Sequence, residues 1–182
     1  MTDDKFQNQY RIPSIRLKCW DYSSTGYYFI TICTLNKEKY FGDIINEKMQ
    51  LSKIGEIAKQ ELLKTEKLRK NVKLDEWIVM PNHIHMIIVI DNSNIETQSI
   101  ASLQQNEEKW EPNKFGPQSN NLASIVRGFK AAVKKWTTMN NVHFEWQSRF
   151  YEHIIRNEED LNKIREYIVY NPVNWLTDED FV

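Results

Sequence analysis

Residues 77–90 decide the fold, and they read WIVMPNHIHMIIVI. Two strongly apolar runs flank Pro81-Asn82, a dipeptide with the chemistry of a tight turn. Apolar, β-branched residues on both sides of a turn are typical of a hairpin. The stretch therefore predicts one strand over residues 72–80 and a returning strand over residues 83–90.

The returning strand carries a pair of histidines, His83 and His85. Residues i and i+2 of a strand point to the same face, so the two imidazoles should lie side by side, with Ile84 and Met86 facing the other way. Two imidazoles held on a rigid strand can ligate one divalent metal. The alternative is that each ring only forms a hydrogen bond near the strand end, because a His-x-His pair also arises by chance.

The composition is that of an ordinary globular protein. With 182 residues, 41% of them apolar and 27% charged, we expect a single domain over residues 1–182. Two cysteines, Cys19 and Cys33, are too few for a disulfide framework or a zinc ribbon and suggest reduced thiols in a cytoplasmic protein. We expect no signal peptide and no contact with a membrane, because the chain starts with polar and acidic residues and has no apolar run near the ~20 residues that cross a bilayer. The net charge of −1 excludes a uniformly basic protein but allows a local basic face.

The rest of the chain predicts a mixture of strands and helices. The expected elements are a strand over 27–34, a hairpin over 42–51 that turns near Asn46-Glu47, helices over 52–69, 122–139 and about 157–170, and a strand at the end of 144–155. Asn157 is typical of a helix N-cap, and Pro172 ends that last helix. Residues 91–121 are polar without an apolar period, so we expect a long surface loop there.

The helix over residues 122–139 has an unusual charge pattern. Its only charged residues are Arg127, Lys130, Lys134 and Lys135, which are all positive. A basic stripe on one helix is a recognised footprint of phosphate binding. The alternative is an ordinary solvated helix face.

The last helix places Tyr167 and Asn171 four residues apart, and therefore on one face. A phenol and an amide could thus point to the same spot. The alternative is that Tyr167 packs in the core with its hydroxyl at the rim, as tyrosines at helical spacing usually do.

Taken together, these segments resemble a known family. Residues 76–90 resemble the histidine–hydrophobe–histidine (HUH) motif of single-strand DNA transposases. Residues 146–153 and 167–172 resemble the REP-associated tyrosine transposases, relatives of the smallest insertion-sequence transposases. Residues 14–18, 27–34 and 125–130 also look like that family, so the resemblance spans residues 10–175 apart from the polar loop.

The resemblance implies a ferredoxin-like α+β fold, in which helices cover one face of an antiparallel sheet (the HUH endonuclease fold). Carried over residue by residue, His83 and His85 match two metal ligands, Asn171 matches a polar third ligand, and Tyr167 matches the nucleophile. Tyr151 and Tyr170 are the competing tyrosines. Nitrogen and oxygen ligands without cysteine favour Mg²⁺ or Mn²⁺ over a structural Zn²⁺.

The implied enzyme is a transposase that cleaves and rejoins single-stranded or hairpin DNA through a covalent 5′-phosphotyrosine. The basic helix would meet phosphates, and Arg16 and Lys18 would add a basic arm. Members of this family work as homodimers or as monomers. The alternatives are a catalytically silent, domesticated DNA-binding protein of the same fold, a replication or conjugation initiator, which is generally larger, and an unrelated metal hydrolase that leaves Tyr167 without a role.

Overall fold

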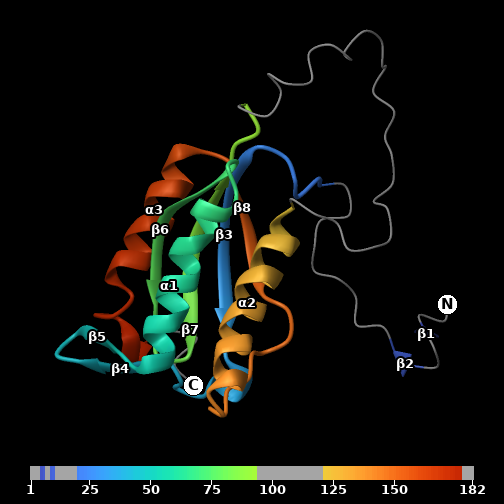
Figure 1. Cartoon of the computed structure of the whole chain (residues 1–182). Helices are drawn as coiled ribbons and strands as arrows, with labels where there is room; N and C mark the ends of the chain where they lie inside the picture. The colour runs from blue at the N-terminus through green and yellow to red at the C-terminus, as the bar shows by residue number, and fades with distance from the viewer. Residues whose placement is uncertain (1–4, 7–8, 11–19, 94–120, 178–182) are drawn as a thin grey trace, which may run out of the picture.

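The computed structural model describes residues 5–6, 9–10, 20–93 and 121–177 (Figure 1). In chain order, its elements are the strands β1 (Lys5–Phe6), β2 (Gln9–Tyr10), β3 (Gly26–Cys33), β4 (Gly42–Ile45) and β5 (Lys48–Leu51), helix α1 (Lys53–Leu68), strands β6 (Val72–Val79) and β7 (His83–Ile90), helix α2 (Leu122–Met139), strand β8 (Tyr151–Ile155) and helix α3 (Glu158–Tyr170). Arg16, Lys18 and most of the loop predicted over 91–121 lie outside the described residues. None of the helices in the described part is long and apolar enough to cross a membrane.

The central sheet has four strands in the order β6-β7-β3-β8, and all neighbours are antiparallel. The predicted hairpin of β6 and β7 is confirmed, and its Pro81-Asn82 turn is tied to the segment that follows β3. Thr34 N–H donates to Asn82 O at 2.8 Å, and Phe41 N–H donates to Pro81 O at 2.9 Å. These bonds fix the turn, and with it the start of β7.

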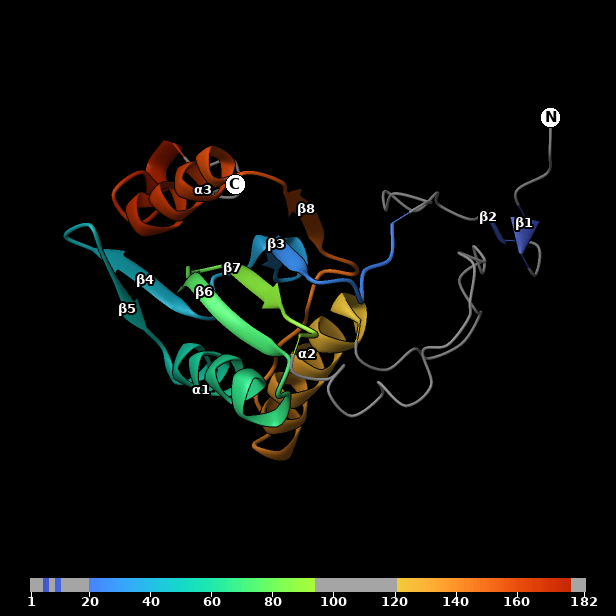
Figure 2. The same cartoon turned by 90° about the horizontal axis from the view of Figure 1, so that it is seen from above.

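The two faces of the sheet are covered by different helices, α1 and α2 on one side and α3 on the other (Figure 2). The α1–α2 side holds the larger apolar core, which includes Tyr28, Ile30 and Ile88. A smaller core under α3 contains Phe29, Ile87, Ile155, Leu161 and Ile168. The predicted α+β class with an antiparallel sheet is confirmed, but the expectation that the helices cover one face is wrong for α3. A strand that is apolar on both faces, as β7 is, needs such two-sided cover.

Local sequence explains where the helices begin. Ser52 accepts from Gly55 N–H at 3.1 Å, Asn157 accepts from Asp160 N–H at 2.8 Å, and Asn121 forms a reciprocal capping box with Ser124. The β4–β5 hairpin turns at Asn46 and Glu47, as predicted, and both have positive φ angles. A two-residue turn with positive φ at both positions matches the right-handed twist of the two strands that it joins.

Candidate active site

The paired histidines lie on β7, facing α3. The register places Thr31 of β3 opposite His85 and Cys33 opposite His83. Both histidines are buried, with ring centroids 4.3 Å apart. The expectation that they project side by side is confirmed, as is the opposite orientation of Ile84 and Met86, which belong to the core on the other face.

Tyr167 of α3 reaches the histidine pair. Its hydroxyl lies 3.2 Å from His85 Nε2, and the two ring centroids are 5.1 Å apart. Phe29 of β3 stacks on His85 at 5.4 Å and meets Tyr167 edge-on at 6.2 Å. The aromatic ring of Phe29 therefore supports both functional rings. Tyr167 keeps 43% of its surface exposed, so it is not the core tyrosine of the alternative interpretation.

Each histidine is oriented through its other ring nitrogen, Nδ1. Thr31 Oγ1 lies 2.9 Å from His85 Nδ1, and Asn82 Oδ1 lies 2.8 Å from His83 Nδ1. An amide oxygen only accepts, so His83 Nδ1 carries the proton and its Nε2 presents a lone pair. Contacts of this kind orient metal-ligating histidines in known sites. The sequence did not single out Thr31 or Asn82, although alternation along β3 puts Thr31 on the same face as Phe29.

Burial makes His85 a weak base. Desolvation lowers the pKa of His85 well below its ordinary value, and the neighbouring His83 lowers it further. The imidazole is therefore neutral at pH 7. A neutral imidazole is the form that ligates a metal or accepts a hydrogen bond from a phenol.

Asn171 lies between two contacts that α3 and its extension make with the histidines. Four residues before it, Tyr167 contacts His85, and four residues after it, Trp175 stacks on His83 at 5.9 Å. Asn171 still has helical backbone angles and is only 1% exposed. It therefore shares the helix face of Tyr167, as its spacing predicts, and points into the protein rather than to solvent.

The donor set suits an open metal site. Two buried atoms, His83 Nε2 and Asn171 Oδ1, make no hydrogen bond within the described part of the chain, although both residues have other contacts. No group of three or more His, Cys, Asp or Glu gathers anywhere among the described residues. A closed structural zinc site needs four such ligands. Two imidazoles and an amide fit an ion that keeps positions for water or substrate.

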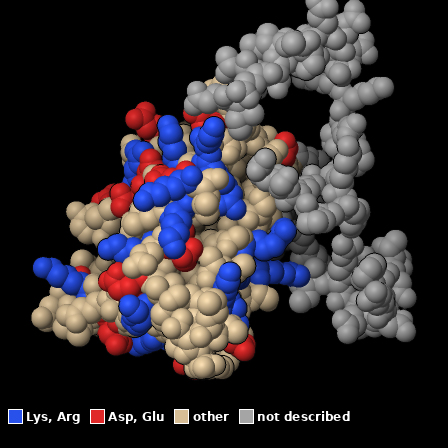
Figure 3. All heavy atoms as spheres, in the orientation of Figure 1, with Lys and Arg blue, Asp and Glu red and all other residues tan. Residues whose placement is uncertain are grey.

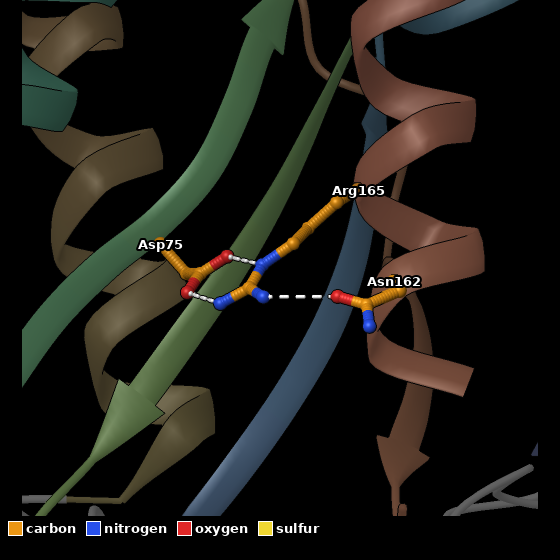
Figure 4. Close-up of polar contacts among 3 residues, drawn as sticks. All are labelled: Asp75, Asn162 and Arg165. Carbon is orange, nitrogen blue, oxygen red and sulfur yellow. Dashed lines mark hydrogen bonds and ion pairs between the residues drawn. The ribbon is translucent and has the colours of Figure 1, made fainter. Parts of the chain in front are cut away.

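An ion pair ties α3 to the edge of the sheet. Asp75 sits where the β6–β7 register shifts by one residue, between Leu74 and Trp77. Its carboxylate accepts from Arg165 Nε at 2.6 Å and from Nη2 at 2.5 Å (Figure 4). The same guanidinium donates to Asn162 Oδ1 at 3.1 Å. This bidentate geometry fixes the guanidinium two residues before Tyr167.

The other tyrosines and His153 are placed differently. Tyr151 of β8 lines the same cleft as Tyr167 and meets Phe29 edge-on, so it remains a competitor. Tyr170 does not line this cleft; it lines a second hollow, which Tyr167 also borders. His153 pairs with Asp160 in the first turn of α3 at 2.8 Å.

Two of the four cations predicted on α2 have structural partners. Lys130 Nζ donates to Gln147 O at 2.7 Å and to Arg149 O at 3.1 Å. Lys134 Nζ donates to Phe144 O at 2.5 Å. Both lysines thus contact the segment that leads into β8, and phosphate binding by the four cations of this helix stays a prediction.

Arg127, Lys134 and Lys135 are exposed, and Lys130 is half-buried. They lie on α2, on the face of the sheet opposite to the histidines (Figure 2). Figure 3 looks onto the α1–α2 face and shows that Lys and Arg gather mainly over the upper end of α1, interleaved with Asp and Glu. A stripe confined to α2 is therefore not the main basic feature of this face.

Comparison with solved structures identifies the fold. The chain is similar to the structure of a REP-associated tyrosine transposase bound to a REP hairpin, with a TM-score of 0.55 and 20% identity over 91% of this chain and 74% of that one. No protein-family model matches the sequence.

Comparison with curated sequences finds two relatives in Haemophilus influenzae. An uncharacterised protein of Haemophilus influenzae is 43% identical over 170 residues, which are 93% of this chain and 92% of that protein. A second protein of H. influenzae, named "Putative REP-associated tyrosine transposase", is 28% identical over 84% of this chain and 73% of its own length. The chain thus resembles REP-associated tyrosine transposases, at 28% identity in sequence and in its fold.

Proposed function

We propose that the protein is a metal-dependent transposase that cleaves and rejoins single-stranded or hairpin DNA through a covalent 5′-phosphotyrosine on Tyr167. The observation that carries this proposal is the contact between the Tyr167 hydroxyl and His85 Nε2, 3.2 Å apart. Both residues line a cleft of about 570 Å³. Tyr167 and His85 are 82 residues apart in the sequence, and their polar atoms meet at a cleft rather than in an apolar core.

The reaction exchanges one phosphoester for another. The Tyr167 oxygen attacks the phosphorus of a DNA phosphodiester and forms a new P–O bond, while the bond from phosphorus to the 3′ oxygen breaks. The phenol loses its proton and the departing 3′ oxygen gains one, which yields a 5′-phosphotyrosine and a free 3′-hydroxyl. A 3′-hydroxyl can then attack in reverse, and DNA is rejoined without ATP.

The phenol needs help, because its ordinary pKa is about 10 and it is mostly protonated at pH 7. Without an ion, the single Nε2 lone pair of the neutral His85 imidazole is suited to accept a hydrogen bond from the Tyr167 hydroxyl. A bound ion would take that lone pair in place of the phenol proton, and the phenol oxygen would still lie beside the ligand. Phe29 keeps both rings in place from below.

A divalent ion completes the proposed site. His83 and His85 would hold it through imidazole nitrogens and Asn171 through its amide oxygen, a donor set that favours Mg²⁺ or Mn²⁺. When bound, the ion supplies Lewis-acid polarisation of the scissile phosphate.

The proposed substrate follows the solved relative, whose structure contains a REP hairpin. The cleft has a volume of about 570 Å³. Polar and aromatic residues line it, Tyr151 among them. Exposed aromatic rings can stack on unpaired bases, which supports single-stranded DNA or a hairpin tail as the occupant.

An adduct assay tests the proposal. Labelled single-stranded and hairpin oligonucleotides are incubated with the protein and Mn²⁺ and resolved on a denaturing gel. We expect a covalent protein–DNA band that is lost in Tyr167→Phe and with EDTA. Tyr170→Phe is the matched control, because Tyr170 lies on the same helix but outside the cleft, and it should keep the band. A band that survives Tyr167→Phe overturns the assignment of the nucleophile.

The same assay separates the alternative of a catalytically silent DNA-binding protein. That protein would bind the oligonucleotides in a salt-dependent manner and form no covalent band on any substrate.

A further inference from the structure

The cleft that holds Tyr167 and His85 has an arginine on its wall. Its floor is formed by β3 and β7, one side by α3, and the other side by residues 147–151. Among the described residues that line it, Arg149 is the only one with a permanent positive charge. The sequence alone assigned no role to Arg149, and it predicted DNA-binding charges on α2 and at Arg16 and Lys18.

The backbone at Arg149 is in an unfavourable conformation. Its φ angle is +68°, in the left-handed region that glycine adopts freely and other residues rarely do. Conformations of this kind persist only where the surroundings determine them, and they cluster at functional sites. Among the described residues that line the cleft, Arg149 is the one with a positive φ angle.

Lys130 holds the backbone at Arg149 through hydrogen bonds. Its amino group donates to the carbonyls of Gln147 and Arg149, at 2.7 and 3.1 Å. In return, Trp146 Nε1 donates to Lys130 O at 3.0 Å, and the Lys130 ammonium lies 5.6 Å from the Trp146 ring centroid. These contacts tie the segment before β8 to α2 on both sides of the turn.

The segment is tied to the sheet as well. Gln147 N–H donates to Cys33 O at 3.0 Å, at the end of β3. The Lys130 ammonium is half-buried where it makes these bonds, and this burial lowers its pKa. Burying part of a charged ammonium costs free energy, which the two hydrogen bonds to loop carbonyls offset. The arrangement fixes the position of this loop.

We propose that Arg149 binds a DNA phosphate in the cleft beside the scissile one, and that Lys130 is the positioning residue that holds Arg149 there. This inference rests on the proposed function. A guanidinium can bind a phosphate through two parallel N–H···O bonds and keeps its charge at every pH of interest. A phosphate held at Arg149 would orient the strand, so that the next phosphodiester faces Tyr167.

Three variants at position 149 separate charge from strain. Arg149→Ala and Arg149→Gly both remove the guanidinium, and Arg149→Lys keeps a charge without the bidentate fork. Binding to a fluorescent DNA hairpin with a single-stranded tail is measured as a function of salt, since this electrostatic term does not depend on sequence. We expect Arg149→Ala to weaken binding about tenfold and to reduce the slope of log K against log[salt] by about 0.7–0.9, the value for one phosphate. Arg149→Lys should keep the slope and lose part of the affinity.

The glycine variant separates a binding role of Arg149 from a purely structural one, because it changes stability and DNA binding in opposite directions. Because glycine tolerates positive φ, Arg149→Gly should raise the melting temperature by about 2 °C while it weakens DNA binding as much as Arg149→Ala. Arg156→Ala is the charge-matched control, because Arg156 lies beyond the other end of β8 and lines a different hollow. It should leave both the slope and the adduct yield near those of the unmodified protein.

A double variant tests the role of Lys130. If Lys130 acts through Arg149, Lys130→Met should weaken binding, and Lys130→Met combined with Arg149→Ala should be no worse than Arg149→Ala alone. Additive losses with a second reduction in salt slope would instead make Lys130 a direct phosphate contact.

The inference fails if Arg149→Ala matches Arg156→Ala in affinity and slope. That failure is distinguishable from failure of the proposed function, because the unmodified protein would still form its Tyr167-dependent adduct. If the unmodified protein neither binds the hairpin at low salt nor forms an adduct, both are overturned.

Discussion

At the scale of single residues, the site depends on two side chains that contact the Nδ1 atoms of the histidines. Thr31 and Asn82 contact the Nδ1 atoms of His85 and His83, so that His85 Nε2 meets Tyr167 at the cleft while His83 Nε2 stays buried. The histidine pair itself could be predicted, because side-chain alternation in a strand is a local rule. Thr31 could not, since its contact with His85 depends on the pairing of strands 54 residues apart.

Thr31→Val should weaken metal binding. It keeps the shape of the side chain but removes the hydroxyl that orients His85, so we expect Mn²⁺ affinity to fall about 10- to 100-fold, the usual effect of losing such a partner. Isothermal titration calorimetry with Mn²⁺ measures this directly. Thr31→Ser retains the hydroxyl and should bind nearly as well as the unmodified protein, whereas equal affinities for all three proteins would show that this hydrogen bond does not orient a metal ligand.

At the scale of elements, the position of α3 is what brings Tyr167 to the histidines. The Arg165–Asp75 pair links the helix to β6, and the residues under the helix form a small core. The sequence predicted the extent of α3 from Asn157 and Pro172, because helix ends follow local rules. It did not predict which face α3 covers, because that depends on how distant apolar surfaces fit together.

Arg165→Met should slow adduct formation more than it destabilises the fold. Arg165 is 39% exposed, and exposed ion pairs contribute only about 0–1 kcal/mol. A small shift of α3 moves Tyr167, however, and a misplacement of about 1 Å can cost up to ~100-fold in rate. Single-turnover adduct formation and thermal melting give the two quantities.

The matched control for this prediction is Lys163→Met. Lys163 pairs with Glu159 within α3, and both are well exposed, so this pair links α3 to no other element. Its loss should change neither the rate nor the melting temperature appreciably. Rates for Arg165→Met and Lys163→Met that agree would contradict a positioning role for the Arg165–Asp75 pair.

At the scale of the whole molecule, one sheet separates two cores with different tasks. The larger core under α1 and α2 supplies most of the buried apolar surface, and the smaller core supports the site. The unbroken apolar run over residues 86–90 contained a signal for this arrangement, since a strand covered on one face usually alternates with polar residues. The contacts of Lys130 and Lys134 could not be predicted, because they depend on loop carbonyls that only the fold brings close to α2.

Neighbouring isoleucines on β7 test this division. Ile87 and Ile88 are both fully buried, but they belong to the α3 core and the α1–α2 core respectively. Ile87→Val and Ile88→Val should each reduce the free energy of unfolding by about 0.5–1.5 kcal/mol in denaturant titrations. Only Ile87→Val should also lower the rate of adduct formation, and an equal loss of rate in both variants would argue that the two cores act as one.

The central claim is that Tyr167 is the residue that becomes joined to DNA. The most direct measurement is to form the adduct with Mn²⁺, digest it with nuclease and protease, and locate the nucleotide remnant by mass spectrometry. We expect the remnant to be attached through phosphate to Tyr167, with Tyr151 and Tyr170 unmodified. A remnant on Tyr151, which lines the same cleft, would contradict it.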